Sequence, residues 1–336
     1  MQRSSIVPLL IVLLVSSAAA AKPAQPMQIY FIDVEGGQST LLVSPSGQSI
    51  LIDTGWAGGR DADRILSAAK AAAIKRIDYV VITHYHQDHV GGVRDLAGRI
   101  KIGAFVDHGA SNEDSDSVRQ EYAIYKKTAA HAVRLVVKPG QGLPMKGIEL
   151  EFLAAAGEHI TDPLPAAGEA NPYCNSGGVS PADASENSQS LGMLITFGKF
   201  KFLDLGDLVE KKQLEMVCPN NLLGTVSLYL TTHHGVNPDN PKSVVWAIHP
   251  LVAIMNNGTR KGGSPEAWQI VHDSPGLADL WQLHYAADGG KDHNVAGDFI
   301  ANIDEQSDGH YIKVTAEASG KFSVTNSRNG YTRNYP

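Results

Sequence analysis

Cysteine is scarce in this chain of 336 residues, which has only Cys174 and Cys218. Neither belongs to a Cys-x-x-Cys pair, so the sequence gives no indication of a metal centre built from paired cysteines. In an exported protein two cysteines are able to form one disulfide, but the sequence does not supply the Cα–Cα distance that the bond requires. The pairing therefore stays open at this point.

A long apolar run is also missing. The best candidate, Ile6–Val15, is too short for a membrane span, which needs about 20 apolar residues. Arg3 before this run and the small residues Ser16–Ala21 after it are typical of a secretory signal peptide. We expect residues 1–21 to be removed, which leaves no membrane span and an exported protein, periplasmic or secreted. An uncleaved anchor is the alternative, and the lack of a following cysteine disfavours a lipoprotein.

An excess of positive charge is absent as well, since the formal net charge is −7. Non-specific binding of nucleic acid depends on basic patches, so the charge does not support a nucleic-acid partner. It does not exclude one at a metal site, where the ions dominate the local charge. No Gly-x-Ser-x-Gly segment is present, which disfavours a covalent serine hydrolase.

What the chain does have is a dense group of metal-binding side chains. His84, His86, Asp88 and His89 fall within six residues and follow the β-branched and aromatic run Ile77–Ile82, which predicts a buried strand. Packing does not explain so many polar groups, because buried polar atoms must find partners, and zinc suits histidine nitrogens and aspartate oxygens. A solvated polar loop that happens to hold three histidines is the alternative.

The segment His84-Tyr85-His86-Gln87-Asp88-His89 resembles the signature of the metallo-β-lactamase-fold hydrolases. Asp33-Val34-Glu35-Gly36-Gly37-Gln38 and His233-His234-Gly235 are similar to the branch that holds the hydrolase domain of DNA-uptake channel proteins and the bacterial phosphorylcholine esterases. The strands expected to end at Asp53-Thr54-Gly55, at Asp207 and at His233 stand in the family's order. The resemblance covers about Met27 to Asn257 and is much more specific for the fold than for the substrate.

The resemblance implies an α+β fold, a four-layer αβ/βα sandwich with a C-terminal β-hairpin extension. We expect one domain over residues 27–336, with a core over about 27–257 and an extension over 258–336. The residue patterns fit this order. They predict strands over 28–34, 39–43, 49–53, 78–82, 102–106, 133–137, 148–153, 191–197, 199–205, 227–231, 252–255, 311–315 and 322–325, and helices over 61–74, 90–97, 117–130 and 208–217.

The resemblance also implies a site for two metal ions. His84 and His86 would bind the first ion and Asp88 and His89 the second, while Asp207 would bridge them. One of His233 and His234 would complete the second site, because adjacent residues on an extended strand point to opposite faces. Asp88 and Asp207 are the predicted catalytic carboxylates, and Asp53 is predicted to brace the ligand loop from behind.

The first metal site departs from the family pattern, which supplies a third histidine before the strand pair that ends at Asp207. This chain has Asn187 there, whose amide oxygen is a weaker ligand, and His159 from the polar segment Glu158–Glu186 is another candidate. His108 and His131 are weaker candidates. We expect zinc as the cofactor, two ions in number, while an amide oxygen makes manganese more plausible than in an all-histidine site.

Three functions follow from this pattern. A metal-dependent hydrolase of phosphodiester or phosphoester substrates is the first, because a metal-bound hydroxide attacks electrophilic phosphorus. A carbonyl hydrolase, meaning a lactonase or β-lactamase acting on a small molecule, is the second. A non-catalytic metal-binding module on the same fold is the third, suggested by the incomplete first site.

Overall fold

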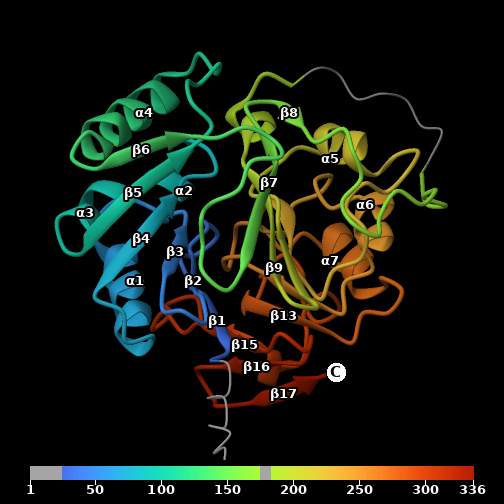
Figure 1. The fold of residues 1–336 in the computed structure, drawn as a ribbon. Helices are drawn as coiled ribbons and strands as arrows, with labels where there is room; N and C mark the ends of the chain where they lie inside the picture. The colour runs from blue at the N-terminus through green and yellow to red at the C-terminus, as the bar shows by residue number, and fades with distance from the viewer. Residues whose placement is uncertain (1–24, 175–182) are drawn as a thin grey trace, which may run out of the picture.

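In the computed structural model, which describes residues 25–174 and 183–336, two β-sheets face each other between two layers of helices (Figure 1). This is the four-layer α+β arrangement predicted from the sequence, which is thereby confirmed. The predicted signal peptide lies outside the described residues. Within the described ranges, no helix has the length and apolar character needed to cross a membrane.

The first sheet has nine strands in the order β17-β16-β15-β1-β2-β3-β4-β5-β6. The strands from β3 to β6 run parallel, so their carboxyl ends lie at one edge, and the others are antiparallel. Its strands are β1 (Met27–Phe31), β2 (Thr40–Val43), β3 (Ser49–Ile52), β4 (Arg76–Val81), β5 (Lys101–Asp107), β6 (Val133–Val136), β15 (Ile312–Ala316), β16 (Phe322–Asn326) and β17 (Thr332–Tyr335).

The second sheet has eight strands in the order β14-β13-β12-β11-β10-β9-β7-β8. Strands β10 to β14 run parallel, and β9 turns antiparallel into β10 at Gly198, as the sequence predicted. Its strands are β7 (Glu149–Ala155), β8 (Glu158–His159), β9 (Gly192–Phe197), β10 (Phe200–Asp204), β11 (Leu228–Leu230), β12 (Val252–Met255), β13 (Asp279–His284) and β14 (Ile300–Asn302).

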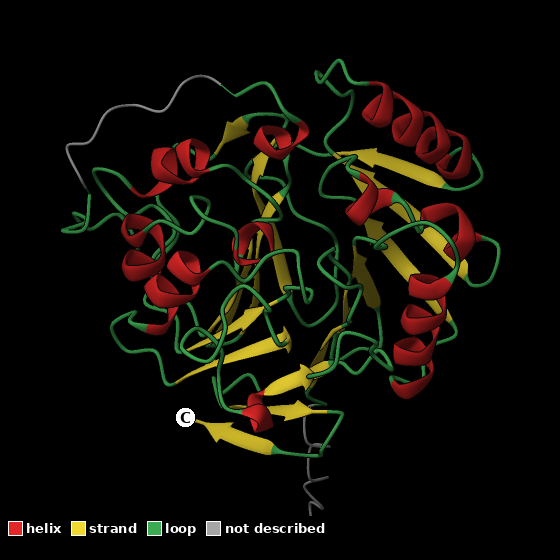
Figure 2. Cartoon of the chain, turned by 180° about the vertical axis from the view of Figure 1, so that it is seen from behind, coloured by secondary structure: helices red, strands yellow, loops and turns green. Residues whose placement is uncertain are grey.

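Helices cover the outer face of each sheet, as both views show (Figure 2). Those on the first sheet are α1 (Arg60–Ala71), α2 (Gln87–Val90), α3 (Val93–Ala97) and α4 (Asp116–Ala129). Those on the second sheet are α5 (Glu210–Val217), α6 (Lys242–Ile248) and α7 (Pro265–His272). Short 3-10 turns are η1 (Glu186–Gln189), η2 (Thr232–Gly235) and η3 (Gly297–Phe299).

The core follows these layers. The alternation of side chains along each strand sends one set between the two sheets, where Phe31 meets Phe202 edge to face, and the other set against the helices. Helix α1 is also buried on one side only, and Ala62, Ile65 and Ala69 form the face that packs on the first sheet. Because both faces of each sheet are packed in this way, the loops at the carboxyl ends of the strands start from fixed positions.

Two elements differ from the sequence prediction. The helix expected over 90–97 is two helices, α2 and α3, because Gly91 and Gly92 separate them while packing against Trp56 and Thr54. The C-terminal hairpin is present as β15 and β16, but β15 pairs with β1 along five residues and β17 adds a further strand. The end of the chain is therefore part of the first sheet.

The polar segment that follows β8 is fixed on the outside of the second sheet up to Cys174. Cys174 and Cys218 form a disulfide with a Cα–Cα distance of 5.8 Å, which answers the question that the sequence left open. Asn171 donates hydrogen bonds to the carbonyls of Val217 and Ser243, at 2.9 and 2.8 Å. The described part of this segment thus contacts α5 and α6.

Removing the disulfide should destabilise the protein. The bond closes a loop across a sequence separation of 44 residues, and restricting such a loop in the unfolded chain is worth about 4 kcal/mol in the chain-entropy model. We expect the Cys174→Ser, Cys218→Ser double variant to lose about 2–4 kcal/mol in a urea unfolding experiment. An unfolding free energy equal to that of the wild type would contradict this expectation.

The carboxyl end of β10 holds a buried acid, Asp204. Asp204 accepts hydrogen bonds from the Gly206 amide and the Gln38 side chain, both at 2.9 Å. Burial nevertheless raises the pKa of Asp204 to about 7. The folded chain therefore keeps a proton there that the unfolded chain releases above about pH 4.

This proton makes stability depend on pH. Because the folded pKa is raised, Asp204 contributes stability at low pH that is lost as the pH rises toward 7. The free energy of unfolding of metal-free protein is measured with urea at pH 5 and at pH 8. Between these two pH values the wild type should lose about 2 kcal/mol more stability than Asp204→Asn. Equal losses in the two proteins would show that Asp204 is ionised in the fold.

Candidate metal centre

The candidate ligands follow the carboxyl ends of strands in both sheets. Asp53 follows β3 and His84 follows β4, while Asp207, His234 and Asn256 follow β10, β11 and β12. Parallel neighbours end at the same sheet edge, and the two sheets face each other, so the loops of both halves meet between them. Residues more than 100 positions apart are thereby brought into contact.

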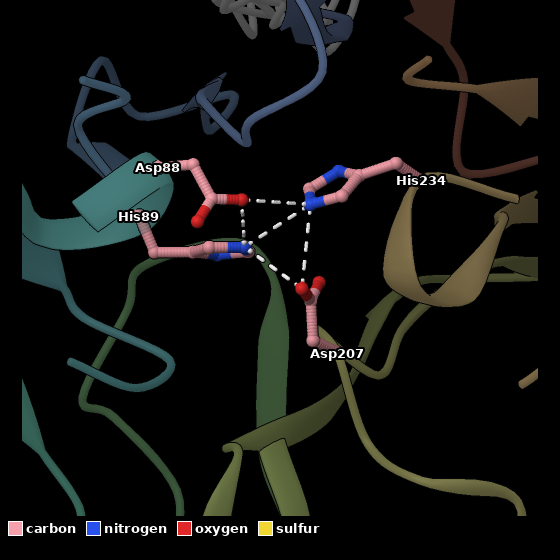
Figure 3. A group of neighbouring side chains, drawn as sticks. All are labelled: Asp88, His89, Asp207 and His234. Atoms are coloured by element: carbon pink, nitrogen blue, oxygen red, sulfur yellow. Dashed lines mark hydrogen bonds and ion pairs between the residues drawn. The ribbon is translucent and has the colours of Figure 1, made fainter. Parts of the chain in front are cut away.

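Four buried ligand atoms form a compact group, which we name the metal cage: Oδ2 of Asp88, Nε2 of His89, Oδ2 of Asp207 and Nε2 of His234 (Figure 3). The His234 nitrogen lies 3.1 Å from the Asp88 oxygen and 3.3 Å from both the His89 nitrogen and the Asp207 oxygen. The His89 nitrogen lies 3.3 Å from Asp88 and 3.1 Å from Asp207.

These separations fit a tetrahedral metal ion. Ligand atoms about 2.0 Å from a central zinc ion lie about 3.3 Å from one another, which is close to the five separations given above, and all four atoms lie within 4.8 Å of one another. The types of the donors fit as well, since imidazole nitrogen and carboxylate oxygen are usual zinc ligands. The cage residues would therefore suit a divalent ion.

The charges of the cage call for a cation at its centre. Burial opposes ionisation of Asp88, but the charge of His89 and a hydrogen bond with His234 hold the pKa of Asp88 well below its usual range. Burial also opposes ionisation of Asp207, and the neighbouring histidines, His234 first, hold its pKa well below its usual range. Both carboxylates are therefore charged in the fold, and a metal ion would take the place of the protons that now balance them.

Hydrogen bonds behind the cage fix the orientation of His89. Its Nδ1 lies 2.7 Å from Oδ2 of Asp53 and donates its proton there, so Nε2 would offer its lone pair to a metal ion that replaces the proton it now carries. Asp53 is itself held by the Thr83 backbone amide at 2.8 Å and by the Thr83 hydroxyl at 2.6 Å. Asp53 thus joins the ring of His89 to Thr83 on the side away from the cage.

His234 has an amide partner instead of a carboxylate. Its Nδ1 lies 3.2 Å from Nδ2 of Asn256, whose buried Oδ1 has no hydrogen-bond partner, so turning this amide by half a turn would let Oδ1 accept the Nδ1 proton. The Nε2 lone pair of His234 then faces the cage. The sequence prediction did not include Asn256, whose only signal is its place directly after the strand Val252–Met255.

The two remaining histidines of the motif form a second group beside the cage. Nε2 of His84 lies 3.0 Å from Nδ1 of His86 and 4.0 Å from Oδ2 of Asp207. The Thr83 hydroxyl lies 3.1 Å from Nδ1 of His84, and Glu113 lies 3.3 Å from Nε2 of His86, so each ring has an outer partner. Both inner nitrogens are therefore available to a first metal ion, with Asp207 between the two groups.

Asn187 lies on η1, which is tied to this second group. The neighbouring Glu186 amide donates to Oε2 of Glu113 at 2.8 Å, the same carboxylate oxygen that contacts His86. The Asn187 side-chain oxygen is buried and has no hydrogen-bond partner, and the same is true of Oδ1 of Asp207. Buried oxygens without partners are unusual, and a cation beside them would satisfy them.

His233 lies next to the cage but outside it. The sequence prediction assumed an extended strand end, whereas His233 and His234 form a turn with left-handed φ values of 51° and 55°. The turn directs His234 into the cage. His233 instead pairs its Nδ1 with Asp239 at 2.7 Å, and its Nε2 lies 3.5 Å from Asp207.

The other candidate histidines lie away from the cage. His159 has its Nε2 3.3 Å from Glu215 on α5 and its Nδ1 2.7 Å from its neighbour's carbonyl, so both nitrogens are occupied elsewhere. The suggestion that His159 replaces the third histidine is therefore wrong. His108 is buried and pairs with Glu186 at 3.2 Å, and His131 is exposed.

The sequence prediction also missed a lysine. Lys261 forms an ion pair with Oδ2 of Asp88, the oxygen that belongs to the cage. Its signal in the sequence is weak, consisting of a glycine-rich segment, Gly258 to Gly263, shortly after a predicted strand. Glu113 gave no sequence signal at all, because it lies in a polar loop far from the motif.

Comparisons with known proteins give a family match for part of the chain. Residues 32–178 match the model of the metallo-beta-lactamase superfamily. The chain is similar to beta-lactamase-like protein 2 homolog of Caenorhabditis elegans, with 36% identity over 64 residues, 19% of this chain and 22% of that protein. It is similar to ComE operon protein 3 of Bacillus subtilis (strain 168), with 23% identity over 249 residues, 69% of this chain and 28% of that protein.

The chain thus spans less than a third of the length of either of these relatives. A solved structure of similar shape is the metallo-beta-lactamase fold protein YhfI from Bacillus subtilis, with 12% identity and a TM-score of 0.47, which covers 93% of this chain and 100% of that one. The His-x-His-x-Asp-His segment lies within residues 32–178, the part of the chain that matches the model of the metallo-beta-lactamase superfamily.

Proposed function

We propose that this protein is an exported, metal-dependent hydrolase that cleaves phosphodiester or phosphoester bonds, with zinc as its metal and two ions in the site. The observation that carries the proposal is the metal cage, in which two buried, ionised carboxylates and two imidazoles are spaced as ligands of one ion. The second histidine pair, His84 and His86, supports a second ion beside the bridging position of Asp207.

Two features support phosphodiesters or phosphoesters as the class of substrate. The segments Asp33–Gln38 and His233–Gly235 resemble the branch with nuclease-like and phosphorylcholine-esterase members, and a lysine stands at the cage, where an anionic substrate would bind. Export is supported by the signal-peptide pattern of residues 1–21 and by the Cys174–Cys218 disulfide, since disulfides persist in oxidising compartments.

A bound divalent ion would supply a nucleophile by lowering the pKa of its water toward neutrality. The chain's own residues set the geometry for this chemistry. Asp53 and Thr83 hold the ring of His89, and Glu113 holds the ring of His86, so the ligand nitrogens need no reorientation. Asp88 and Asp207 keep the site negative, which retains the cations that an anionic substrate requires.

The two ion sites should differ in affinity. The cage offers four charged or imidazole donors, whereas the proposed first site has two imidazoles and, as the resemblance implies, the weaker amide oxygen of Asn187. Zinc titration of metal-stripped protein by calorimetry should therefore show one tight and one weaker site. Asn187→His should tighten the weaker site by about tenfold or more, because imidazole binds zinc better than amide oxygen does.

Asn329→His is the matched control for this titration, since it adds an imidazole at an exposed position. It should leave both affinities unchanged. If Asn187→His behaves like Asn329→His, the amide of Asn187 does not face the first ion.

The reaction class is tested by direct turnover. Protein without residues 1–21, loaded separately with zinc and manganese, is given a chromogenic phosphodiester, a lactone and a cephalosporin. We expect cleavage of the phosphodiester, reduced by more than about a hundredfold in His86→Ala and Asp88→Ala, because loss even of a ligand's outer partner costs 10–100-fold. Asp63→Ala, which removes an exposed carboxylate paired with Arg99, should retain activity.

Two outcomes would replace the proposal. Turnover of the lactone or cephalosporin alone would make the protein a carbonyl hydrolase, the second function suggested by the sequence. Tight metal binding without turnover of any of the three substrates would favour the non-catalytic module.

A further inference from the structure

We propose that Lys261 binds a phosphoryl oxygen of the substrate and thereby selects anionic substrates at the metal cage. The inference rests on the proposed hydrolase function and extends it to a residue that determines specificity. The Lys261 ammonium group lies against a cage oxygen and has no other acidic partner among the described residues.

Lys261 is distinguished first by its location. Within the described ranges, no other lysine or arginine forms an ion pair with Asp88 or Asp207. The Asp88 oxygen that it contacts also faces His89 and His234, so the ammonium stands at the border of the cage. A carboxylate oxygen has more than one lone pair, and Oδ2 of Asp88 is therefore able to meet a metal ion and Lys261 together.

The ammonium is also accessible. The Lys261 side chain is 37% exposed, whereas that of Asp88 is only 8% exposed. The Lys261 ammonium also lies over the Trp56 ring, with Nζ 5.1 Å from the ring centroid. An aromatic face attracts a cation but leaves its hydrogen-bond donors free, so Lys261 retains donors for a ligand that arrives from solvent.

The backbone holds Lys261 firmly at this position. We name residues 258–263 the lysine loop. The Gly258 amide donates to the Lys261 carbonyl at 2.8 Å, and the Gly263 amide donates to the His234 carbonyl at 2.9 Å. A Cβ at Gly262, which has a φ of +77°, would lie 2.2 Å from the same His234 carbonyl. The glycines therefore let the loop lie directly on the ligand turn.

The Asp33–Gln38 segment holds the loop from the other side. A Cβ at Gly36 would lie 2.7 Å from Cβ of Lys261, and a Cβ at Gly258 would lie 2.6 Å from the Glu35 backbone. Oδ1 of Asp33 accepts a hydrogen bond from Nε2 of His284 at 2.6 Å. The other nitrogen of His284 lies 3.3 Å from the Thr259 hydroxyl, so one buried histidine links this segment to the lysine loop.

A purely structural role explains this arrangement poorly. An ammonium beside a carboxylate that also binds a divalent ion repels that ion, and this repulsion weakens metal binding. The ion pair itself adds little stability when the lysine is partly exposed. The positive charge becomes useful when an anion binds, because a phosphoryl group then meets the metal ions on one side and an ammonium on the other.

The test measures phosphate binding instead of turnover. Inorganic phosphate is titrated by calorimetry into protein saturated with zinc, with the metal content per chain measured in every sample. Lys261→Met removes the charge and keeps an unbranched side chain, and it should weaken phosphate binding by about tenfold or more, as expected for a hydrogen bond to a charged group. Lys261→Arg keeps the charge and should stay within about threefold of wild type.

Arg260→Met is the matched control. It removes one positive charge from the same loop, but Arg260 is 72% exposed and pairs with Glu305. Unchanged phosphate affinity in Arg260→Met and weakened affinity in Lys261→Met, at equal metal content, supports the proposal. Equal affinities in wild type and Lys261→Met, equal losses in both Met variants, or no phosphate binding by the wild type overturns it.

The phosphate-binding test of Lys261 and the turnover test of the proposed function can fail independently of each other. If phosphate binding depends on Lys261 but no phosphodiester is cleaved, the hydrolase assignment fails and the anion site stands. If phosphodiesters are cleaved while phosphate affinity is the same in Lys261→Met, only the role of Lys261 fails.

Discussion

The mutual repulsion of two buried carboxylates is the constraint on which the rest of this structure depends. Asp88 and Asp207 lie within the same small group of atoms, and both are ionised despite their burial. Such a pair is stable only beside positive charge, which protonated histidines, Lys261 or a metal ion are able to provide. The side chains around them are accordingly of two kinds. Some would contact the metal ion directly, and others, such as Asp53 and Glu113, hold the rings of His89 and His86 in place.

The fold meets this constraint by joining two half-sites. The first sheet delivers the His-x-His-x-Asp-His segment and Asp53, and the second delivers Asp207, His234 and Asn256. Neither half holds all four cage atoms. Because the two sheets share one apolar interface, the packing of large side chains between them determines the distances among polar atoms at its edge. Core packing and metal geometry are therefore coupled in this molecule.

The sequence predicted what depends on short-range pattern. The strands are visible in their β-branched runs, and the ligands of the motif and Asp207 are visible because they directly follow such runs. The partners of those ligands were not predictable, since Glu113 and Lys261 reach the site only through tertiary packing. The sequence left the choice between His233 and His234 open, and alternation along a strand was unable to decide it, because a left-handed turn replaces the extended conformation there.

The pairing of β15 with β1 has a consequence for how the chain folds. The second strand neighbour of β1, β15, is synthesised about 280 residues after it, so one edge of β1 stays without strand partners until β15 has been made. Contacts between such distant segments slow folding and leave edges that pair with other chains. A chain that crosses a membrane unfolded would have all its strands present when folding begins, and would avoid a long-lived intermediate with an open sheet.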